Sequence, residues 1–315
     1  MRILLVTKAP SSIQKYLQDR EDIILMVVNC NNNSDVVLAN LRDMLNGGDV
    51  DVIITYRCPI ILPSDIFSKA KLVAFNIQAS LLPKYPVCDP WEAICLNHDK
   101  KSGVTLHKLD RGICTGKIII QREFEANSIR SEISYIEIVE KYAIILLDDM
   151  LFAFDNTRYD KLNSSKLREN GSNLNEVSML AKHFFSSGYI NGKLDLPDIS
   201  TKDFEYAFEL YYTISHFYES KEQFQNALTQ NVFVLFLSMK IYGKVHERTA
   251  SCYEYAAELQ AKLGMEEKAM NSQRMANEIR ERIYGFSHER YIQGLQKFGE
   301  IGFLIGEYKR RNGKV

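Results

Sequence analysis

The sequence predicts an α/β domain with an open, Rossmann-like sheet, followed by an all-α domain of helical repeats. Two observations support this division. Short β-branched runs alternate with polar, helix-like windows up to about residue 155, whereas beyond residue 176 a single proline remains among helically spaced aromatic, Leu and Ala residues. A length of 315 residues suffices for two cores. We therefore expect a first domain at 1–162, a linker at 163–175 and a second domain at 176–315.

The first domain is expected to contain six strands and four helices. The strands are predicted at Ile3–Val6, Ile23–Val28, Val52–Thr55, Leu72–Asn76, Gly103–Lys108 and Ile118–Phe124, where β-branched and aliphatic residues cluster. The helices are predicted at Ser11–Gln18, Ser34–Leu45, Cys88–Leu96 and Tyr135–Phe154. The segment 163–175 lacks such periodicity and is rich in Ser, Asn and Gly, as is typical of a linker.

The second domain contains an internal repeat. Ile241-Tyr242-Gly243, followed by His246-Glu247-Arg248, recurs 42 residues later as Ile283-Tyr284-Gly285, followed by His288-Glu289-Arg290. We expect His246 and His288 to stabilise the turns between repeats rather than to bind a metal.

Small residues accompany this repeat at Ala257, Gly264, Ala269 and Ala276. In these positions the region resembles tetratricopeptide repeats, whose paired helices need small residues to approach closely, in a long form of about 42 residues. A later copy has Gly299, Gly306 and Tyr308, and a looser earlier copy has Ser215, Phe224 and Ala227. Three copies are about the minimum for a continuous core. The resemblance implies a concave face for a protein or peptide partner, or self-association as a homodimer.

Composition excludes several classes of protein. The 39 Lys and Arg balance 40 Asp and Glu, so no bulk charge attracts nucleic acid or anionic lipid. No apolar run approaches the roughly 20 residues of a membrane span, and the first apolar run is too short for a signal peptide. The six cysteines form no CxxC pair or zinc-ligand spacing. We expect a cytoplasmic protein with reduced thiols, no metal site and no membrane contact.

Three segments of the first domain carry the functional signal. They are Phe75-Asn76-Ile77-Gln78-Ala79-Ser80-Leu81-Leu82-Pro83, Gly103-Val104-Thr105 and Asp110-Arg111-Gly112-Ile113-Cys114-Thr115-Gly116-Lys117-Ile118. In order and spacing they resemble the catalytic domain of the 10-formyltetrahydrofolate-dependent formyltransferases, whose pattern is Asn-x-His-x-Ser-Leu-Leu-Pro, Gly-Val-Thr and Asp-x-Gly-x-Asp-Thr-Gly-x-Ile. The resemblance covers roughly residues 1–150 and implies a formyltransferase-type fold.

The resemblance implies three catalytic positions. In the family, an Asn and a protonated His stabilise the oxyanion formed when an amine attacks the formyl carbon, and an Asp supports the His. These positions carry Asn76, Gln78 and Cys114 here, so two of the three depart from the family. Val87 departs too, because it stands where the family has a glycine for an unusual turn.

The resemblance also implies residues that bind 10-formyltetrahydrofolate. The segment Ile53–Pro63 matches the strand and loop that wall the folate pocket, and the only tryptophan, Trp91, is expected beside that pocket. The expected folate-binding residues are Tyr56, Ile60, Leu81, Leu82, Pro83, Asp110 and Gly112.

The two departures weaken the expected catalysis. Gln78 can donate a hydrogen bond but brings no charge, and the Cys114 thiol, with an ordinary pKa of about 8.5, is a poor base unless Arg111 or Lys117 lowers that pKa. His107 and His98 are candidates to fill the gap, although a structural role for His107 and a solvated position for His98 are the simpler interpretations.

Three functional hypotheses remain open. The first is formyl transfer to a small amine or an amino sugar carried on a nucleotide; a tRNA acceptor is disfavoured, because no tRNA-binding β-barrel follows the catalytic half. The second is an inactive formyltransferase-fold protein whose repeats recruit a protein partner. The third is nucleophilic chemistry by Cys114.

Overall fold

The computed structural model of the chain describes residues 1–8, 10–31, 33–127, 129–155 and 174–313. Two compact units are present, one built mainly from Met1–Phe154 and the other mainly from the helices that follow. Residues 163–173 of the predicted linker lie outside the described ranges, whereas Asn175 lies in the first turn of a helix.

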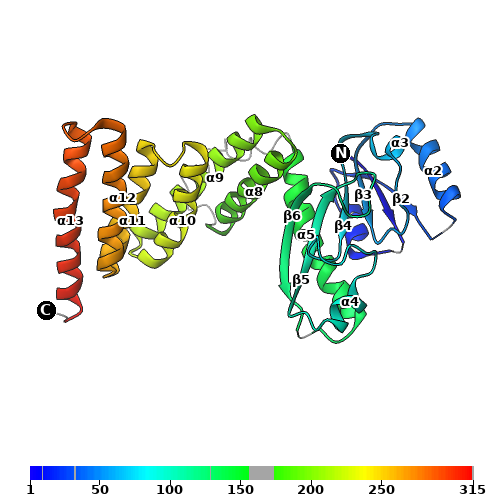
Figure 1. Cartoon of the computed structure of the whole chain (residues 1–315), viewed down its shortest axis with the longest axis horizontal. Coiled ribbons are helices and arrows are strands. Elements are labelled where there is room, and N and C mark those ends of the chain that lie inside the picture. Colours follow the sequence, from blue (N-terminus) through cyan, green and yellow to red (C-terminus); the bar gives the residue numbers. More distant parts are fainter. Residues whose placement is uncertain (9, 32, 128, 156–173, 314–315) are drawn as a thin grey trace. The chain divides into compact units, whose positions relative to one another are not determined.

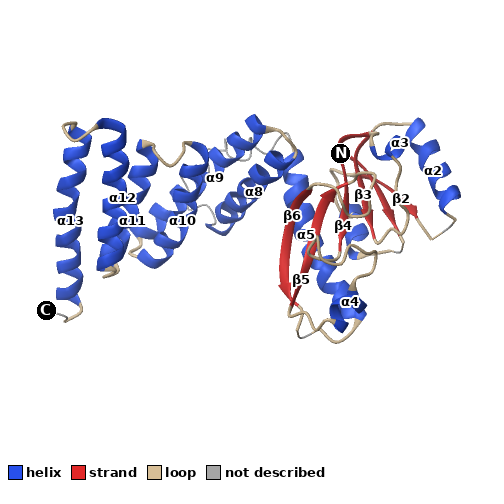
Figure 2. Ribbon diagram, viewed as in Figure 1, coloured by secondary structure: helices blue, strands red, loops and turns tan. Residues whose placement is uncertain are grey.

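The first unit contains one six-stranded sheet, ordered β2-β1-β3-β4-β5-β6. Its strands are β1 (Arg2–Thr7), β2 (Ile24–Asn29), β3 (Val50–Tyr56), β4 (Ala70–Gln78), β5 (Lys101–Lys108) and β6 (Ile118–Glu125). The first four strands are parallel, while β5 pairs antiparallel with β4 and β6 antiparallel with β5 (Figure 2). All six predicted strands are confirmed, as is the open sheet.

Within the described residues of this unit, five helices accompany the sheet. They are α1 (Ser12–Gln18), α2 (Ser34–Asn46), α3 (Ser64–Phe67), α4 (Trp91–Leu96) and α5 (Glu132–Phe154). Helices α2 to α5 are labelled in Figure 1. The short helix α3 is not predicted by the sequence analysis, and α4 begins three residues later than expected. The later start follows from Pro90, because the residue before a proline is disfavoured in helical conformation.

The central parallel strands β1 and β3 are buried on both faces, whereas the edge strand β2 is largely exposed. Leu4 and Val6 of β1 belong to a core cluster with Val37 and Leu41 of α2. Successive side chains of a strand point to opposite faces, so the fully buried Ile3 and Leu5 face the other side of the sheet.

The second unit is all-helical, as predicted. Its helices are α8 (Leu174–Lys193), α9 (Pro197–Ser220), α10 (Phe224–Ile241), α11 (Glu247–Lys262), α12 (Glu266–Tyr284) and α13 (Glu289–Arg311). Helix α9 packs against α10, α11 packs against α12, and α13 packs against both α11 and α12. Within the described ranges, no helix of either unit is both long enough and apolar enough to cross a membrane.

The small residues predicted in the middle and earlier copies lie where helices meet, whereas those of the later copy do not. Ala257, Ala269 and Ala276 are fully buried between α11 and α12, and a Cβ atom at Gly264 would overlap the Tyr308 ring. In the earlier copy, the Ser215 hydroxyl donates to the Ala227 carbonyl at 2.8 Å. In the later copy, which among the described residues consists of α13 alone, Gly299 and Gly306 contact no second helix, because nothing lies within 4 Å of their Cβ positions.

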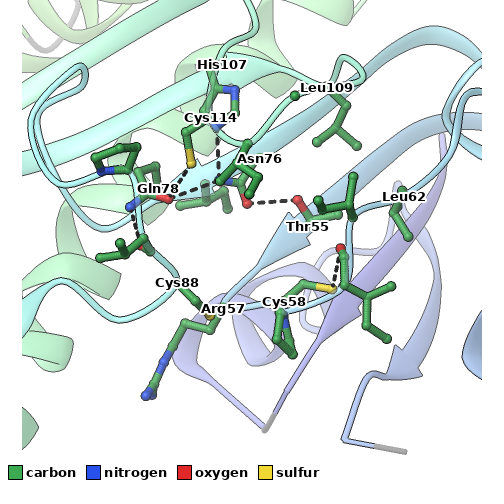
Figure 3. Close-up of a pocket in the computed structure, with 18 of the residues that line it drawn as sticks. Thr55, Arg57, Cys58, Leu62, Asn76, Gln78, Cys88, His107, Leu109 and Cys114 are labelled. Atoms are coloured by element: carbon green, nitrogen blue, oxygen red, sulfur yellow. Dashed lines mark hydrogen bonds between the residues drawn. The ribbon is translucent and has the colours of Figure 1, made fainter. Parts of the chain in front are cut away.

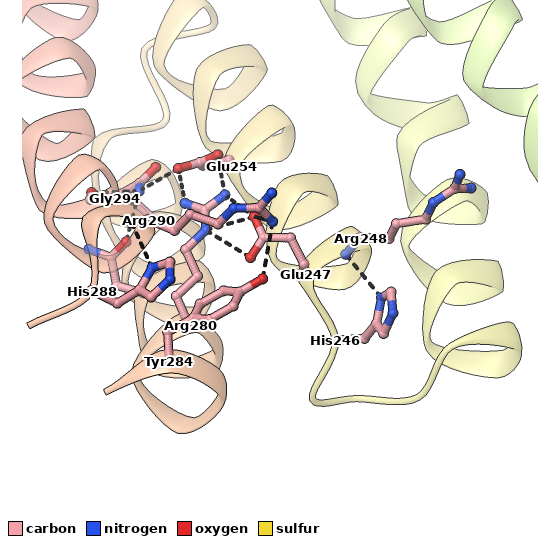
Figure 4. A network of polar contacts seen from close by, with 11 residues as sticks. His246, Glu247, Arg248, Glu254, Arg280, Tyr284, His288, Arg290 and Gly294 are labelled. Carbon is pink, nitrogen blue, oxygen red and sulfur yellow. Dashed lines mark hydrogen bonds and ion pairs between the residues drawn. The ribbon is translucent and has the colours of Figure 1, made fainter. Parts of the chain in front are cut away.

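The repeated motif caps two helices in the same way (Figure 4). The Nδ1 atoms of His246 and His288 accept the backbone N–H of Arg248 and Arg290, both at 3.1 Å, at the first turns of α11 and α13. Each histidine ring also stacks on the tyrosine four residues before it. The turn-stabilising role expected of both histidines is confirmed.

We predict that Gly103→Ala destabilises the first unit by about 1–3 kcal/mol, the usual range for overpacking a filled core. The added methyl group would overlap the Arg122 carbonyl oxygen and the Leu81 side chain. Urea denaturation measures the change in the free energy of unfolding. Gly47→Ala is the matched control, because its Cβ would approach no atom closer than 3.7 Å, and equal stability of the two variants would contradict the prediction.

Candidate functional site

The first unit contains a cavity of about 360 Å³ at the carboxyl ends of β3 and β4 (Figure 3). Ligands of open α/β sheets bind at this edge, and the volume lies in the range of small-molecule sites. Residues from three loops complete the cavity. The lining residues are Thr55, Arg57, Cys58, Pro59, Ile60, Ile61, Leu62, Asn76, Ile77, Gln78, Ala79, Pro86, Val87, Cys88, His107, Leu109, Asp110, Gly112, Ile113 and Cys114.

A row of three polar side chains crosses the sheet at this edge. Strand register pairs Thr55 of β3 with Asn76 of β4, and Asn76 with His107 of β5. Paired residues on neighbouring strands present their side chains to the same face, about 5 Å apart. The Thr55 hydroxyl donates to Asn76 Oδ1 at 2.8 Å, and Asn76 Nδ2 lies 3.1 Å from His107 Nε2.

The hydrogen bonds of His107 assign its tautomer. Its Nδ1 atom lies 3.0 Å from the Lys108 carbonyl oxygen, which can only accept, so Nδ1 carries the proton. Nε2 then accepts from the Asn76 amide. Burial lowers the pKa of His107 below its usual range, against the opposing effects of the Lys108 carbonyl and Asp110. His107 is therefore a neutral group that orients Asn76.

Gln78 lies two residues after Asn76 on the same face of β4, and its side chain is almost fully buried. Its Nε2 atom donates to the Val87 carbonyl at 2.7 Å and lies near the Tyr85 carbonyl at 3.2 Å. Its Oε1 atom accepts from Asn76 Nδ2 and from Cys114 Sγ, each at 3.4 Å. The amide N–H groups of Gln78 are thus directed at the 85–87 loop.

Cys114 contacts this network from the loop between β5 and β6. Its backbone φ is +55°, in the left-handed region where Asp and Asn are enriched among non-glycine residues. Burial raises the pKa of the Cys114 thiol, and the negative charge of Asp110 raises it further. Neither Arg111 nor Lys117 contributes to this shift, so the pKa of the thiol is not lowered as it would have to be for Cys114 to act as a base. The thiol's hydrogen-bond partner is an amide oxygen, which cannot act as its base.

The loop after β4 is held by charged side chains. Asp89 accepts hydrogen bonds from Lys8 at 2.8 Å and from Arg57 at 2.9 Å. Burial opposes ionisation of Asp89, but these two cations outweigh it and lower the pKa of the carboxyl group. The left-handed residue of this loop is Tyr85, with φ of +55°, whereas Val87 has no positive φ. The special turn expected at Val87 therefore lies two residues earlier.

The structure divides the expected folate-binding residues into two groups. Ile60, Asp110 and Gly112 line the cavity. Tyr56 does not, because its buried hydroxyl donates to Glu140 of α5 at 3.3 Å. Leu81, Leu82 and Pro83 also lie outside the lining; Leu81 packs over Gly103 of β5, and the Leu82 N–H donates to Thr105 Oγ1 at 3.1 Å.

Two other expected residues lie away from the cavity. His98 is exposed in the turn after α4. Trp91 begins α4 and packs on Tyr135, with ring centroids 5.2 Å apart, so it is not among the lining residues. Sequence reasoning missed Cys88 as a lining residue; it placed Thr55, Arg57 and Cys58 in the segment that walls the pocket but did not single them out. For Thr55, the polar residue near the carboxyl end of an otherwise apolar strand was an available signal.

The arrangement limits the chemistry of the site. Acyl transfer needs a hydrogen-bond donor directed at the oxygen that becomes negatively charged. It also needs a base that accepts the proton of the attacking group. Asn76 and Gln78 donate to neighbouring protein atoms, and His107 accepts from Asn76. In the described part of the chain, no group of three or more His, Cys, Asp or Glu side chains could hold a metal ion.

Comparisons with known proteins match the first part of the chain. The family model described as formyl transferase matches residues 3–143. The chain is 39% identical over 79 residues to the bifunctional polymyxin resistance protein ArnA of Wigglesworthia glossinidia brevipalpis, covering 25% of this chain and 12% of that protein. It is 28% identical over 183 residues to the methionyl-tRNA formyltransferase of Finegoldia magna, covering 58% and 54%. The chain thus spans about half or less of the length of these curated relatives.

Among solved structures, the phosphoribosylglycinamide formyltransferase of Streptococcus pneumoniae matches with a TM-score of 0.41 and 17% identity. The match covers 49% of this chain and 98% of that chain.

We predict that His107 stays neutral at pH 6.5 and titrates at a lower pH, because burial disfavours its charged form. The unfolded chain, with an ordinary pKa near 6.5, then binds the proton first, so the free energy of unfolding falls as pH drops from 6.5 towards the folded-state pKa. NMR titration of the imidazole measures this pKa. His107→Gln should remove this part of the pH dependence and the exposed His98→Gln should not; a His107 pKa at or above 6.5 would refute the assignment.

We also predict that Cys114 is alkylated by iodoacetamide more slowly than the exposed Cys95 at pH 7.5, because its raised pKa leaves little thiolate. Asp110→Asn keeps the oxygen that accepts from Gly112 and Thr115 but removes the charge, so it should shift the Cys114 pH profile to lower pH. Peptide-resolved mass spectrometry gives both rates. Faster alkylation at Cys114 than at Cys95 would favour the nucleophile hypothesis instead.

Proposed function

Because residues 3–143 form a domain of the formyl transferase family, we propose that this domain binds a 10-formyltetrahydrofolate-type ligand in the Asn76 cavity and transfers its formyl group slowly or not at all. The observation that carries this proposal is the closed network in which Thr55, Asn76, His107, Gln78 and Cys114 hydrogen-bond to one another.

The walls of the cavity suit a flat heteroaromatic ligand. Ile60, Ile61, Leu62 and Ile113 supply apolar surface, while Asp110 supplies a carboxylate at the same cavity. Sites of this kind combine predominantly apolar walls with a few polar groups that orient the ligand. A pterin ring, which is flat and carries N–H donors, has matching chemistry.

The polar network argues against rapid transfer. For an amine to attack the formyl carbon, the carbonyl oxygen must gain a hydrogen-bond donor and the nitrogen must lose a proton. Both amides of the network already donate within the protein, and the raised pKa of Cys114 makes it a weak proton acceptor at neutral pH. Loss of one oxyanion donor costs about 10²–10³ in rate and loss of acid–base help about 10²–10⁴.

A second function is favoured by the helical unit, which we propose binds a protein or peptide partner. A cavity of about 340 Å³ there is lined by Phe208, Tyr212, His216, Asn231, Arg248 and Tyr255, among others. Asn231 is almost fully buried, yet within the described part of the chain its Oδ1 atom has no hydrogen-bond partner, and neither has His216 Nε2. A buried amide oxygen without a donor is unfavourable, and a peptide N–H would satisfy it. The resemblance to tetratricopeptide repeats supports the same role.

The first test is calorimetric titration of the full chain with a stable formyl-folate, 5-formyltetrahydrofolate. We expect saturable binding that Ile113→Glu weakens, because it places a charge on an apolar cavity wall at an exposed position. Leu96→Glu is the matched control, since Leu96 is also exposed but lies outside the cavity lining. Absence of binding would overturn the folate part of the proposal.

The transfer step is tested separately by release of tetrahydrofolate from 10-formyltetrahydrofolate, with an amino sugar nucleotide as acceptor. We expect little release above the uncatalysed rate. The double change Gln78→His with Cys114→Asp should raise the rate by about a hundredfold or more, because it restores an ionisable donor and a carboxylate at a backbone conformation that Asp tolerates. Fast turnover by the unaltered chain would show that the network opens and that the protein is an active transferase.

A further inference from the structure

Helix α13 has two different faces. On one, the buried Ile301 and Ile305 pack into a cluster with Ala257, Ala261 and Ala269. The opposite side, which we call the α13 outer face, consists of Ile292, Leu295, Gly299, Gly302, Phe303 and Gly306. Spacings of three and four residues place these six on one stripe of the helix.

The outer face is apolar, and the Arg310 guanidinium lies over its Phe303 ring, 6.0 Å from the ring centroid. Ile292, Leu295 and Phe303 are 45%, 46% and 63% exposed. Nothing within the described ranges lies within 4 Å of a Cβ placed at Gly299, Gly302 or Gly306. Three large apolar side chains therefore share this stripe with three open glycine positions.

The 42-residue repeat shows what kind of element covers such a face. Counted back by this offset, Ile292, Gly299 and Phe303 correspond to Ala250, Ala257 and Ala261 of α11. Those three alanines are buried, and they belong to the clusters that contain the α12 residues Ala269 and Ala276. In α11, this face is thus covered by an adjacent helix that presents small residues seven positions apart.

We infer that the α13 outer face binds the same face of a second copy of this chain, with the two α13 helices antiparallel. Helix α13 itself carries small residues seven positions apart, Gly299 and Gly306. A second α13 helix can therefore cover this face with small residues, as α12 covers the corresponding face of α11. The inference does not depend on the folate proposal.

The face is complementary to itself when the two-fold axis passes near Gly299. In that register Leu295 lies opposite Phe303 of the second copy, and Ile292 lies opposite its Gly306. Each large side chain then meets an apolar side chain or an open glycine position, and the glycines at the axis let the two backbones approach closely.

The helix dipoles favour the antiparallel orientation. Glu289 lies in the first turn of α13, and Lys309, Arg310 and Arg311 lie in the last. Within the protomer Lys309 pairs with Glu266 and Arg310 with Glu307, so the end charges contribute little. An antiparallel pair places Glu289 of one helix beside Lys309 of the other, and it also opposes the two helix dipoles. Near the middle, Glu300 is neutralised by Lys297 at 2.8 Å, so it adds no strong repulsion.

Sedimentation equilibrium of the full chain tests the inference. We expect a dimer whose dissociation constant rises about a hundredfold in Phe303→Glu and in Gly299→Leu. Neither change disturbs the protomer, because Phe303 is exposed and Gly299 has open space around its Cβ position. Val232→Glu, at an apolar residue of α10 that is 61% exposed, is the matched control and should leave the dimer intact. A monomeric unaltered chain, or a dimer unaffected by both variants, would overturn the inference.

Cross-linking provides a second measurement that does not rely on loss of association. In a Cys95→Ser background, which removes the exposed native thiol, Gly299→Cys should form a disulfide between two copies under mild oxidation, because residue 299 lies near the proposed axis. Val232→Cys in the same background should not. Equal cross-linking of the two variants would place the contact elsewhere and refute the α13 pairing.

Discussion

The register of β4 between β3 and β5 is the constraint on which the site depends. It aligns Thr55, Asn76 and His107 in one row. One hydroxyl, one amide and one imidazole group therefore meet at the edge of the sheet where β3 and β4 end. A shift of one residue would turn Asn76 and Gln78 to the opposite face and bury Phe75 or Ile77 in the cavity instead. The filled cores on both faces of the sheet exclude that shift, so the polar row is held by apolar packing.

The same register explains why the polar groups satisfy one another. Side chains on paired strands lie close enough to hydrogen-bond directly, and Gln78 extends the row towards the carbonyl groups of Tyr85 and Val87. Such a network is rigid and leaves few buried polar atoms without partners, which stabilises the edge of the sheet. A charged histidine at position 78 would hydrogen-bond differently, so the neutral glutamine is consistent with a pocket shaped for binding rather than for proton transfer.

The sequence predicted the strands, most of the helices and the position of the cavity, because these follow from local apolar patterns and from the order of motifs. It could place Asn76 and Gln78 on one face, since alternation along a strand is local. It could not orient His107 or Gln78, because their partners depend on strand register and on a loop conformation set by distant contacts. Tyr56 and Leu81 show the same limit: although both are adjacent in sequence to lining residues, Tyr56 packs into the core and Leu81 packs over Gly103.

The helical repeat shows that equal sequence motifs need not imply equal surroundings. The capping residues of α11 and α13 are identical and form the same hydrogen bonds, because a helix start is a local structure. The outer faces have diverged, with alanines in α11 but isoleucine, glycine and phenylalanine in α13. Glycine inside a helix costs about 1 kcal/mol relative to alanine, so three glycines on one exposed stripe weaken α13 when nothing approaches them. Close approach of another backbone would offset that cost, and a stripe that combines large apolar side chains with open glycine positions has the shape that such an approach requires.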